Sequence, residues 1–209
     1  GEITAGTFHS FCFDLLRRNS GALMEAGGFS RFPSVIDDEE RKEMMLELIR
    51  RDLARFMGVP AVVIHDLLMR GNRLDGWKKR KIEDSGLGAK LALLDDEYRD
   101  AKRRKCLIDY DDMMICAIDL LERNRAVRAG VLERYRYVFV DEFQDVSDDN
   151  IRLLKLLLPD REGDLFAVGD DWQSIYGFRG ASVEYIVNMK RHFPGARIHR
   201  LTVNYRSRK

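Results

Sequence analysis

The spacing of apolar residues along the chain predicts an early pair of helices. The first covers residues 7–18 and ends at the polar run 19–21. The second begins after Asp37 or Asp38, either of which is a suitable helix cap. Its apolar face consists of Met44, Met45, Leu48 and Ile49. We expect these methionines to fill a core.

Residues 60–105 also have a mostly helical pattern, and another helix begins beyond them at Asp109. Asp112 stands three residues after Asp109, which is the spacing of a capping box. The apolar face of this last helix consists of Met113, Met114, Ala117, Ile118 and Leu121.

The pattern changes after Tyr137, where short continuous apolar runs replace the helical spacing. Such runs predict fully buried strands at 137–140 and 165–168. A helix carrying Ile151, Leu154, Leu157 and Leu158 separates them, so the strands should be parallel with a right-handed crossover. We also expect a helix at 182–192 and a third strand at 198–203. The predicted fold class is α/β.

Composition limits the class of protein. The 209 residues are 45% hydrophobic and 34% charged, which is typical of a soluble chain with one good core or two small ones. The net charge of +1 means that binding to nucleic acid depends on local patches. Three scattered cysteines, Cys12, Cys106 and Cys116, fit reduced thiols in a cytoplasmic protein. Residues 1–6 do not resemble a signal peptide and read as part of a strand, so we expect a piece of a longer protein.

Two carboxylates, Asp141 and Glu142, follow directly after the apolar run Val138–Val140. Ligand sites of parallel α/β sheets lie at the carboxyl ends of the strands. There one acid can hold Mg²⁺ and the next can orient an attacking water, as in the Walker B motif of nucleotide hydrolases. A plain polar strand end is the alternative. The sequence contains no Gly-Lys pair, so a phosphate-binding G-x-x-x-x-G-K-[ST] loop is absent from it.

Two further segments end the neighbouring strands. Residues 169–181 read Gly-Asp-Asp-Trp-Gln-Ser-Ile-Tyr-Gly-Phe-Arg-Gly-Ala, in which a glutamine suits a phosphate-bound water and the aromatic and arginine side chains suit bases and phosphates. The alternative is a glycine-rich loop with a packed aromatic ring. Residues 204–207 read Asn-Tyr-Arg-Ser, a tyrosine that can stack on adenine beside an arginine that can neutralise a phosphate.

Together with Thr-Phe-His-Ser-Phe at 7–11 and Ile-Asp-Tyr-Asp-Asp at 108–112, these segments resemble superfamily 1 DNA helicases of the UvrD/Rep/PcrA type. Trp172 is reminiscent of the helicase IV branch. The resemblance covers nearly the whole chain and is weakest at 22–105. It implies a RecA-like parallel sheet at 1–20 and 107–209 and an inserted all-helical subdomain at 21–106. It also implies that the phosphate-loop segment and the second RecA-like domain are not in this sequence.

The resemblance implies a role for each matching residue. The magnesium ligand would be Asp141, and Glu142 would activate water. The γ-phosphate of ATP would be contacted by Gln173 and Arg206, and Tyr205 would stack on adenine. Single-stranded DNA would be contacted by Thr7, His9, Tyr176, Phe178 and Arg179. The family usually has tryptophan where this chain has Phe178, and the smaller ring covers less of a base.

The implied function is ATP-dependent 3′-to-5′ translocation on single-stranded DNA and unwinding at duplex junctions, with the fragment itself inactive. One alternative is a helicase subunit of a RecB/AddA-like helicase–nuclease. Another is a DNA-binding module without catalysis. The basic runs 78–81 and 102–105 are either solvated helix faces or phosphate contacts to duplex DNA.

Overall fold

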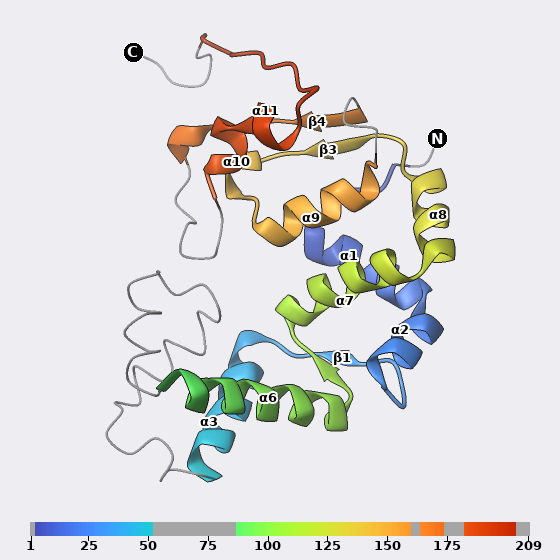
Figure 1. Cartoon of the computed structure of the whole chain (residues 1–209), viewed down its shortest axis with the longest axis vertical. Helices are drawn as coiled ribbons and strands as arrows, with labels where there is room; N and C mark the ends of the chain where they lie inside the picture. Colours follow the sequence, from blue (N-terminus) through green and yellow to red (C-terminus); the bar gives the residue numbers. More distant parts are fainter. Residues whose placement is uncertain (1–2, 52–86, 160–163, 174–181, 204–209) are drawn as a thin grey trace. The chain divides into compact units, whose positions relative to one another are not determined.

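The computed structural model describes residues 3–51, 87–159, 164–173 and 182–203 (Figure 1). The chain forms two compact units, Gly1–Val131 and Leu132–Lys209. In unit 1 the elements are α1 (Phe8–Arg18), α2 (Ser20–Gly27), β1 (Ser34–Val35), α3 (Asp38–Arg51), α6 (Leu87–Lys105), β2 (Leu107–Ile108) and α7 (Tyr110–Arg123). Helix α8 (Arg125–Arg134) crosses the boundary between the units.

Helix α1 packs against α7, although the two are far apart in the sequence. Its start is capped by Thr7, whose Oγ1 accepts a hydrogen bond of 3.1 Å from the backbone N–H of Ser10. Its end lies at Asn19, as the polar run predicted. Cys12 faces the interior, where its Sγ lies 3.5 Å from Met114 Sδ. Burial raises the pKa of the Cys12 thiol to about 12.

Helices α3 and α6 share a second core in unit 1. The α3 helix is capped by Asp37, whose Oδ1 accepts hydrogen bonds from the backbone N–H groups of Glu39 and Glu40. The core contains Met44, Met45, Leu48, Ile49, Leu94, Tyr98 and Ala101. The predicted apolar face and the methionine packing are therefore confirmed.

The short strands β1 and β2 pair in parallel, with Ser34 opposite Leu107 and Val35 opposite Ile108. Directly after β2, Asp109 and Asp112 form the predicted capping box at the start of α7. The predicted apolar residues of α7 are all buried. This sequence of elements places the start of α7 beside the end of α6.

In unit 2 the elements are β3 (Val138–Val140), η3 (Phe143–Asp145), α9 (Asp148–Leu157), β4 (Leu165–Ala167), η5 (Asp171–Gln173), α10 (Glu184–Val187) and α11 (Met189–His192). Strands β3 and β4 are parallel, as predicted, with Phe139 opposite Phe166. Backbone hydrogen bonds continue past the strands, from Val168 N–H to Val140 O and from Phe143 N–H to Val168 O. These bonds hold the two strand ends together at the edge where the acidic residues emerge.

The prediction that both strands are fully buried is wrong. Side chains alternate between the two faces of a strand, so one face carries Val140 and the other carries Phe139. Val140 is buried, whereas Phe139 is 75% exposed and Phe166 is 59% exposed. The two rings contact each other, with centroids 5.8 Å apart. One face of the β3–β4 pair is therefore apolar but uncovered by the described residues.

The end of unit 2 differs from the sequence prediction in two further ways. Residues 198–203 form no strand, and the helix predicted at 182–192 is divided into α10 and α11 at Asn188. Within the described part of the chain, no helix is both long and apolar enough to cross a membrane.

Candidate functional site

Asp141 and Glu142 emerge at the carboxyl end of β3, and both are exposed. Glu142 has φ 51° and ψ 44°, the left-handed region that residues other than glycine rarely occupy. Its backbone N–H donates to Asp141 Oδ1 at 2.9 Å. Such backbone strain persists only where surrounding contacts hold it, and it is common at active sites. The turn places two carboxylates at the strand end, where a bound ligand can reach them.

The second predicted segment follows β4 and lies beside this turn. The Asp170 carboxylate accepts from the Trp172 backbone N–H at 3.1 Å and from Gln173 Nε2 at 2.7 Å. Gln173 is exposed and lies in the short helix η5. Trp172 is 92% exposed. Asp170 therefore organises the turn that presents the predicted phosphate-contacting glutamine.

Gln144 joins the two strand ends and was not singled out from the sequence. It is only 1% exposed. Its Nε2 donates to Glu142 Oε2 at 2.6 Å, and its Oε1 accepts from the Asp170 backbone N–H at 2.9 Å. A polar residue two positions after an acidic pair is common, so only the tertiary structure reveals this bridge.

The carboxylates fit a magnesium ion by their chemistry. Mg²⁺ binds proteins through one or two carboxylates and otherwise keeps water and substrate oxygens. Asp141 offers an exposed carboxylate of this kind at the end of β3. Among the described residues, no group of three or more His, Cys, Asp or Glu side chains forms a metal cage. Asp141 would therefore supply one ligand to a magnesium ion, and water and substrate oxygens would supply the others.

The early predicted DNA-contacting residues lie in unit 1. His9 is exposed on α1, and its ring meets the edge of the Tyr110 ring with centroids 5.8 Å apart. Tyr110 is itself exposed at the start of α7 and was not proposed from the sequence. Thr7 is exposed too, but its hydroxyl has a structural role as the cap of α1. Tyr176, Phe178, Arg179, Tyr205 and Arg206 lie outside the described residues.

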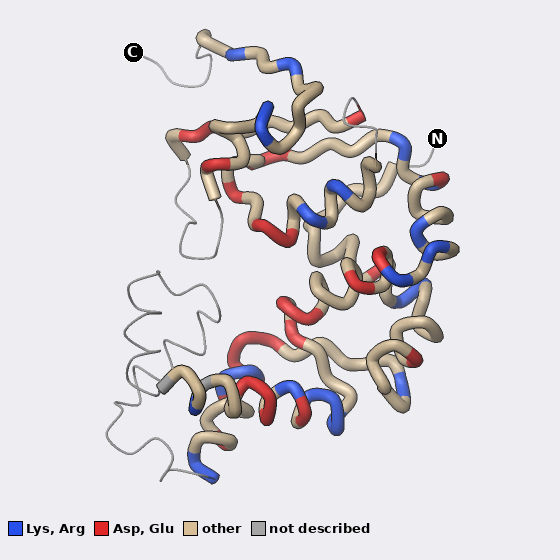
Figure 2. Tube along the Cα trace, in the orientation of Figure 1, with Lys and Arg blue, Asp and Glu red and all other residues tan. Residues whose placement is uncertain are grey.

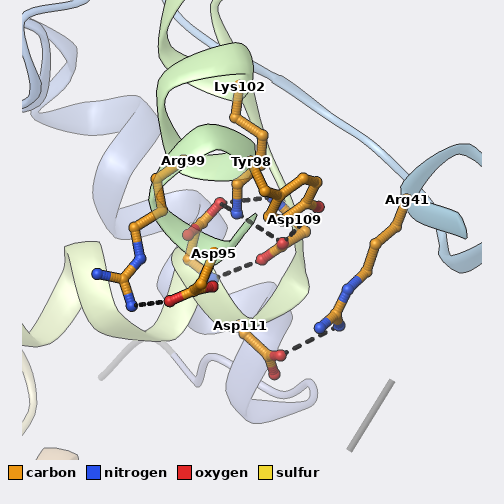
Figure 3. A network of polar contacts seen from close by, with 8 residues as sticks. Arg41, Asp95, Tyr98, Arg99, Lys102, Asp109 and Asp111 are labelled. Atoms are coloured by element: carbon orange, nitrogen blue, oxygen red, sulfur yellow. Dashed lines mark hydrogen bonds and ion pairs between the residues drawn. The ribbon is translucent and has the colours of Figure 1, made fainter. Parts of the chain in front are cut away.

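The prediction that the basic run 102–105 faces solvent or DNA is wrong for Lys102, which is only 5% exposed. Its Nζ lies 2.7 Å from Asp109 Oδ2 and 2.5 Å from Asp112 Oδ2. Tyr98 also donates to Asp109 Oδ2, at 2.9 Å (Figure 3). Lys102 is therefore an internal ion-pair partner and belongs to no solvated or DNA-facing surface.

The remaining residues of that run are exposed in the last turn of α6, and acidic residues lie earlier in the same helix (Figure 2). Several neighbours pair with each other, such as Arg99 with Asp95 at 2.6 Å. For the exposed residues 103–105, the alternatives of a solvated helix face and a phosphate contact stay predictions. The other basic run, 78–81, lies outside the described residues.

Burial and the contacts among Tyr98, Lys102, Asp109 and Asp112 shift the pKa values of the two carboxylates and the phenol. Burial alone would raise the pKa of Asp109, but the Lys102 charge and several hydrogen bonds outweigh it and hold that pKa below its usual value. Burial and the neighbouring Asp109 charge raise the pKa of Asp112. Burial and the Asp109 charge likewise raise the pKa of Tyr98.

Comparison with known proteins identifies the relatives of this chain. The family described as UvrD/REP helicase N-terminal domain matches residues 1–194. The chain belongs to this family. Its α/β fold with parallel strands agrees with the RecA-like domain of UvrD/REP helicases.

The curated relatives that match this chain are named as ATP-dependent DNA helicases. The chain is 31% identical to the ATP-dependent DNA helicase Rep of Escherichia coli K12, over 96% of this chain and 29% of that protein. It is 29% identical to the ATP-dependent DNA helicase PcrA of Leuconostoc citreum, over 99% of this chain and 27% of that protein. PcrA of Staphylococcus epidermidis RP62A is 30% identical over 99% of this chain and 28% of that protein. The chain thus spans less than a third of these UvrD/REP relatives.

Proposed function

We propose that this chain is part of an ATP-dependent DNA helicase that couples ATP hydrolysis to 3′-to-5′ translocation on single-stranded DNA and to unwinding at duplex junctions. The observation that carries the proposal is the strained Glu142 turn at the end of a parallel strand, beside Asp141. It is joined by hydrogen bonds to the turn that presents Gln173. Membership of the UvrD/REP family supports the same activity. We place the protein in the cytoplasm.

The chemistry assigns a separate task to each acidic residue. Glu142 accepts a proton from the attacking water, as a general base must. Asp141 holds Mg²⁺ through a carboxylate oxygen. Magnesium, when bound, neutralises charge that develops on the phosphate oxygens. Gln173 contacts the γ-phosphate from the neighbouring strand end.

Outside the described residues, we assign Arg206 to the γ-phosphate, Tyr205 to the adenine ring, and Tyr176, Phe178 and Arg179 to single-stranded DNA. Within unit 1, the adjacent rings of His9 and Tyr110 support a DNA contact there. Both side chains are exposed, and aromatic faces stack on bases without regard to sequence. Thr7, which is exposed, contributes by capping and so placing the first turn of α1.

We propose that the functional division of the chain is a RecA-like part at 1–20 and 107–209 with an inserted helical part at 21–106. The packing of α1 against α7 supports the joining of residues 1–20 to the first helix of the segment 107–209. The α3–α6 core supports a separate helical part.

The test uses the full-length protein that contains this chain. We expect ATP turnover that depends on magnesium and rises with single-stranded DNA, and unwinding of a duplex with a 3′ overhang in preference to a 5′ overhang. DNA binding without any turnover would overturn the proposal in favour of a binding module. ATP-dependent degradation of the DNA would favour a helicase–nuclease subunit.

A further inference from the structure

Gln144 links the predicted water-activating residue to the second strand end. A side-chain amide donates and accepts hydrogen bonds on one rigid plane. Here it donates to the Glu142 carboxylate and accepts from the Asp170 backbone N–H. A glutamate of the same size would set one carboxylate against another, and a methionine would satisfy neither partner. An amide therefore matches the chemistry of both partners at this position.

The packing around Gln144 leaves little room for movement. A Cβ atom on Gly169 would lie 2.5 Å from Gln144 Oε1 and 3.0 Å from the Phe143 backbone nitrogen. Any residue larger than glycine would push the amide away from its place. The backbone hydrogen bond from Phe143 N–H to Val168 O, at 2.8 Å, holds the same two strand ends together. The amide is buried and is held from both sides.

The hydrogen bonds form a continuous chain between two residues of the proposed site. Gln173 Nε2 donates to Asp170 Oδ2, the Asp170 N–H donates to Gln144 Oε1, and Gln144 Nε2 donates to Glu142 Oε2. The hydrogen bond from Gln144 Nε2 holds the Glu142 carboxylate on the side of the 170–173 turn. A shift of the 170–173 turn would change the position of Gln144 and, through it, the carboxylate of Glu142.

We propose that Gln144 is a positioning residue that couples the 170–173 turn to the orientation of Glu142. This inference rests on the proposed function. Gln144 makes water activation depend on the state of the turn that carries Gln173. A correctly aimed Glu142 is then available only when that turn is in place.

The experiment compares Gln144→Met, Gln144→Asn and Lys155→Met in the full-length protein. Methionine keeps the length but makes neither hydrogen bond, and asparagine keeps an amide that is one methylene shorter. Lys155 is exposed on α9 and serves as the control. The measurements are kcat and KM for ATP with and without single-stranded DNA, affinity for a fluorescent ATP analogue, thermal stability, and hydrogen exchange of the Asp170 amide.

We expect Gln144→Met to lower the DNA-stimulated kcat about 100-fold, the loss that a misplaced catalytic group causes. KM and analogue affinity should stay within about threefold, because the ATP contacts themselves remain. The stimulation by DNA should fall towards unity, and the Asp170 amide should exchange faster. Gln144→Asn should recover part of the rate, and Lys155→Met should match the unaltered protein.

Gly169→Ala provides a second route to the same result if Gln144→Met does not fold, since the added methyl group displaces Gln144 without removing it. It should lower kcat with KM retained. Unchanged DNA-stimulated turnover in the folded Gln144→Met or Gly169→Ala protein would overturn the inference alone. So would a proportional loss of rate, analogue affinity and stability, which indicates a merely structural role. Absence of DNA-stimulated turnover in the unaltered protein would overturn the proposed function, and the inference with it.

Discussion

The Lys102 ammonium lies 2.7 Å from the Asp109 carboxylate inside unit 1, and both side chains are almost fully buried. The pair joins the last turn of α6 to the cap of α7. Removing one member of a buried pair leaves an uncompensated charge, which is costly. Lys102 therefore serves the fold, although its sequence context is a basic run.

We expect Lys102→Met to lower the free energy of unfolding by about 3–5 kcal/mol at pH 7. Lys105→Met removes an exposed lysine of the same run and should change it by less than about 0.5 kcal/mol. Urea titrations of both variants measure the difference. Equal changes in the free energy of unfolding for the two variants would show that the buried Lys102–Asp109 pair contributes no more to stability than an exposed lysine does.

The effect of Lys102→Met should depend on pH with a definite sign. In the native protein the pKa of Asp109 is lowered, so its contribution to stability is present above the unfolded pKa of about 3.9 and is lost as pH falls through the lowered value. Without Lys102, the charge of Arg41 still acts on Asp109, but the main opposition to burial is lost and the native pKa values of Asp109 and Asp112 both rise. Stability of the variant then falls as pH rises through the unfolded pKa. The destabilisation should be larger at pH 7 than at pH 4.5, and the opposite trend would contradict this account.

Thr7→Ala should destabilise unit 1 by about 1 kcal/mol, because the Ser10 backbone N–H loses its capping acceptor. Thr7→Ser keeps the hydroxyl and should stay near the unaltered stability. Chemical unfolding of the two variants distinguishes the methyl group from the hydroxyl. Equal unfolding free energies of the alanine and serine variants would show that the hydroxyl cap contributes nothing to stability. The role of Thr7 would then be limited to the proposed contact with DNA.

Glu142→Gln in the full-length protein should abolish ATP hydrolysis while leaving ATP binding intact. The amide keeps the size of the side chain but cannot take a proton from water. Turnover assays and titration with a fluorescent ATP analogue together provide the measurement. A parallel loss of binding and turnover would assign Glu142 to ATP binding and not to water activation.

The chain as printed should not turn over ATP, because the sequence contains no Gly-Lys phosphate loop. Steady-state assays with magnesium and single-stranded DNA should stay at background, with the full-length protein as the positive control. Turnover near the typical enzymatic rate of about 10 s⁻¹ would refute the expectation.

Phe178→Ala in the full-length protein should weaken binding to single-stranded DNA by about 1–3 kcal/mol, the contribution of one stacked base. The melting temperature should change little, because a ring flanked by Gly177 and by Arg179-Gly180 is expected to be exposed. Fluorescence anisotropy and thermal melting provide the two readings. A loss of about 3–5 kcal/mol in stability with DNA affinity intact would instead identify a core ring.

Local patterns in the sequence were enough to predict α1, α3, α7 and α9, but α2 and α8 were not predicted. The caps of α1, α3 and α7 depend on side chains within three residues of the N–H groups that they satisfy. The apolar faces repeat with the period of the helix itself. The parallel pairing of β3 and β4 also followed, because a helix between two apolar runs leaves few other arrangements. The position of Asp141 and Glu142 at a strand end is a consequence of that pairing.

Contacts between distant residues were decided by the tertiary structure alone. Val138–Val140 is apolar throughout, but whether each face is covered depends on other segments, and Phe139 stays exposed. Residues 198–203 have a strand-like sequence and gain no pairing partner among the described residues. Lys102 belongs to a basic run in the sequence but pairs with the buried carboxylate of Asp109 in the structure. Gln144 forms hydrogen bonds to both strand ends. By itself the sequence determined α1, α3, α7 and α9, the caps of α3 and α7 and the acidic end of β3, because those interactions are local. Burial and long-range hydrogen bonds require partners that only the folded chain brings within reach.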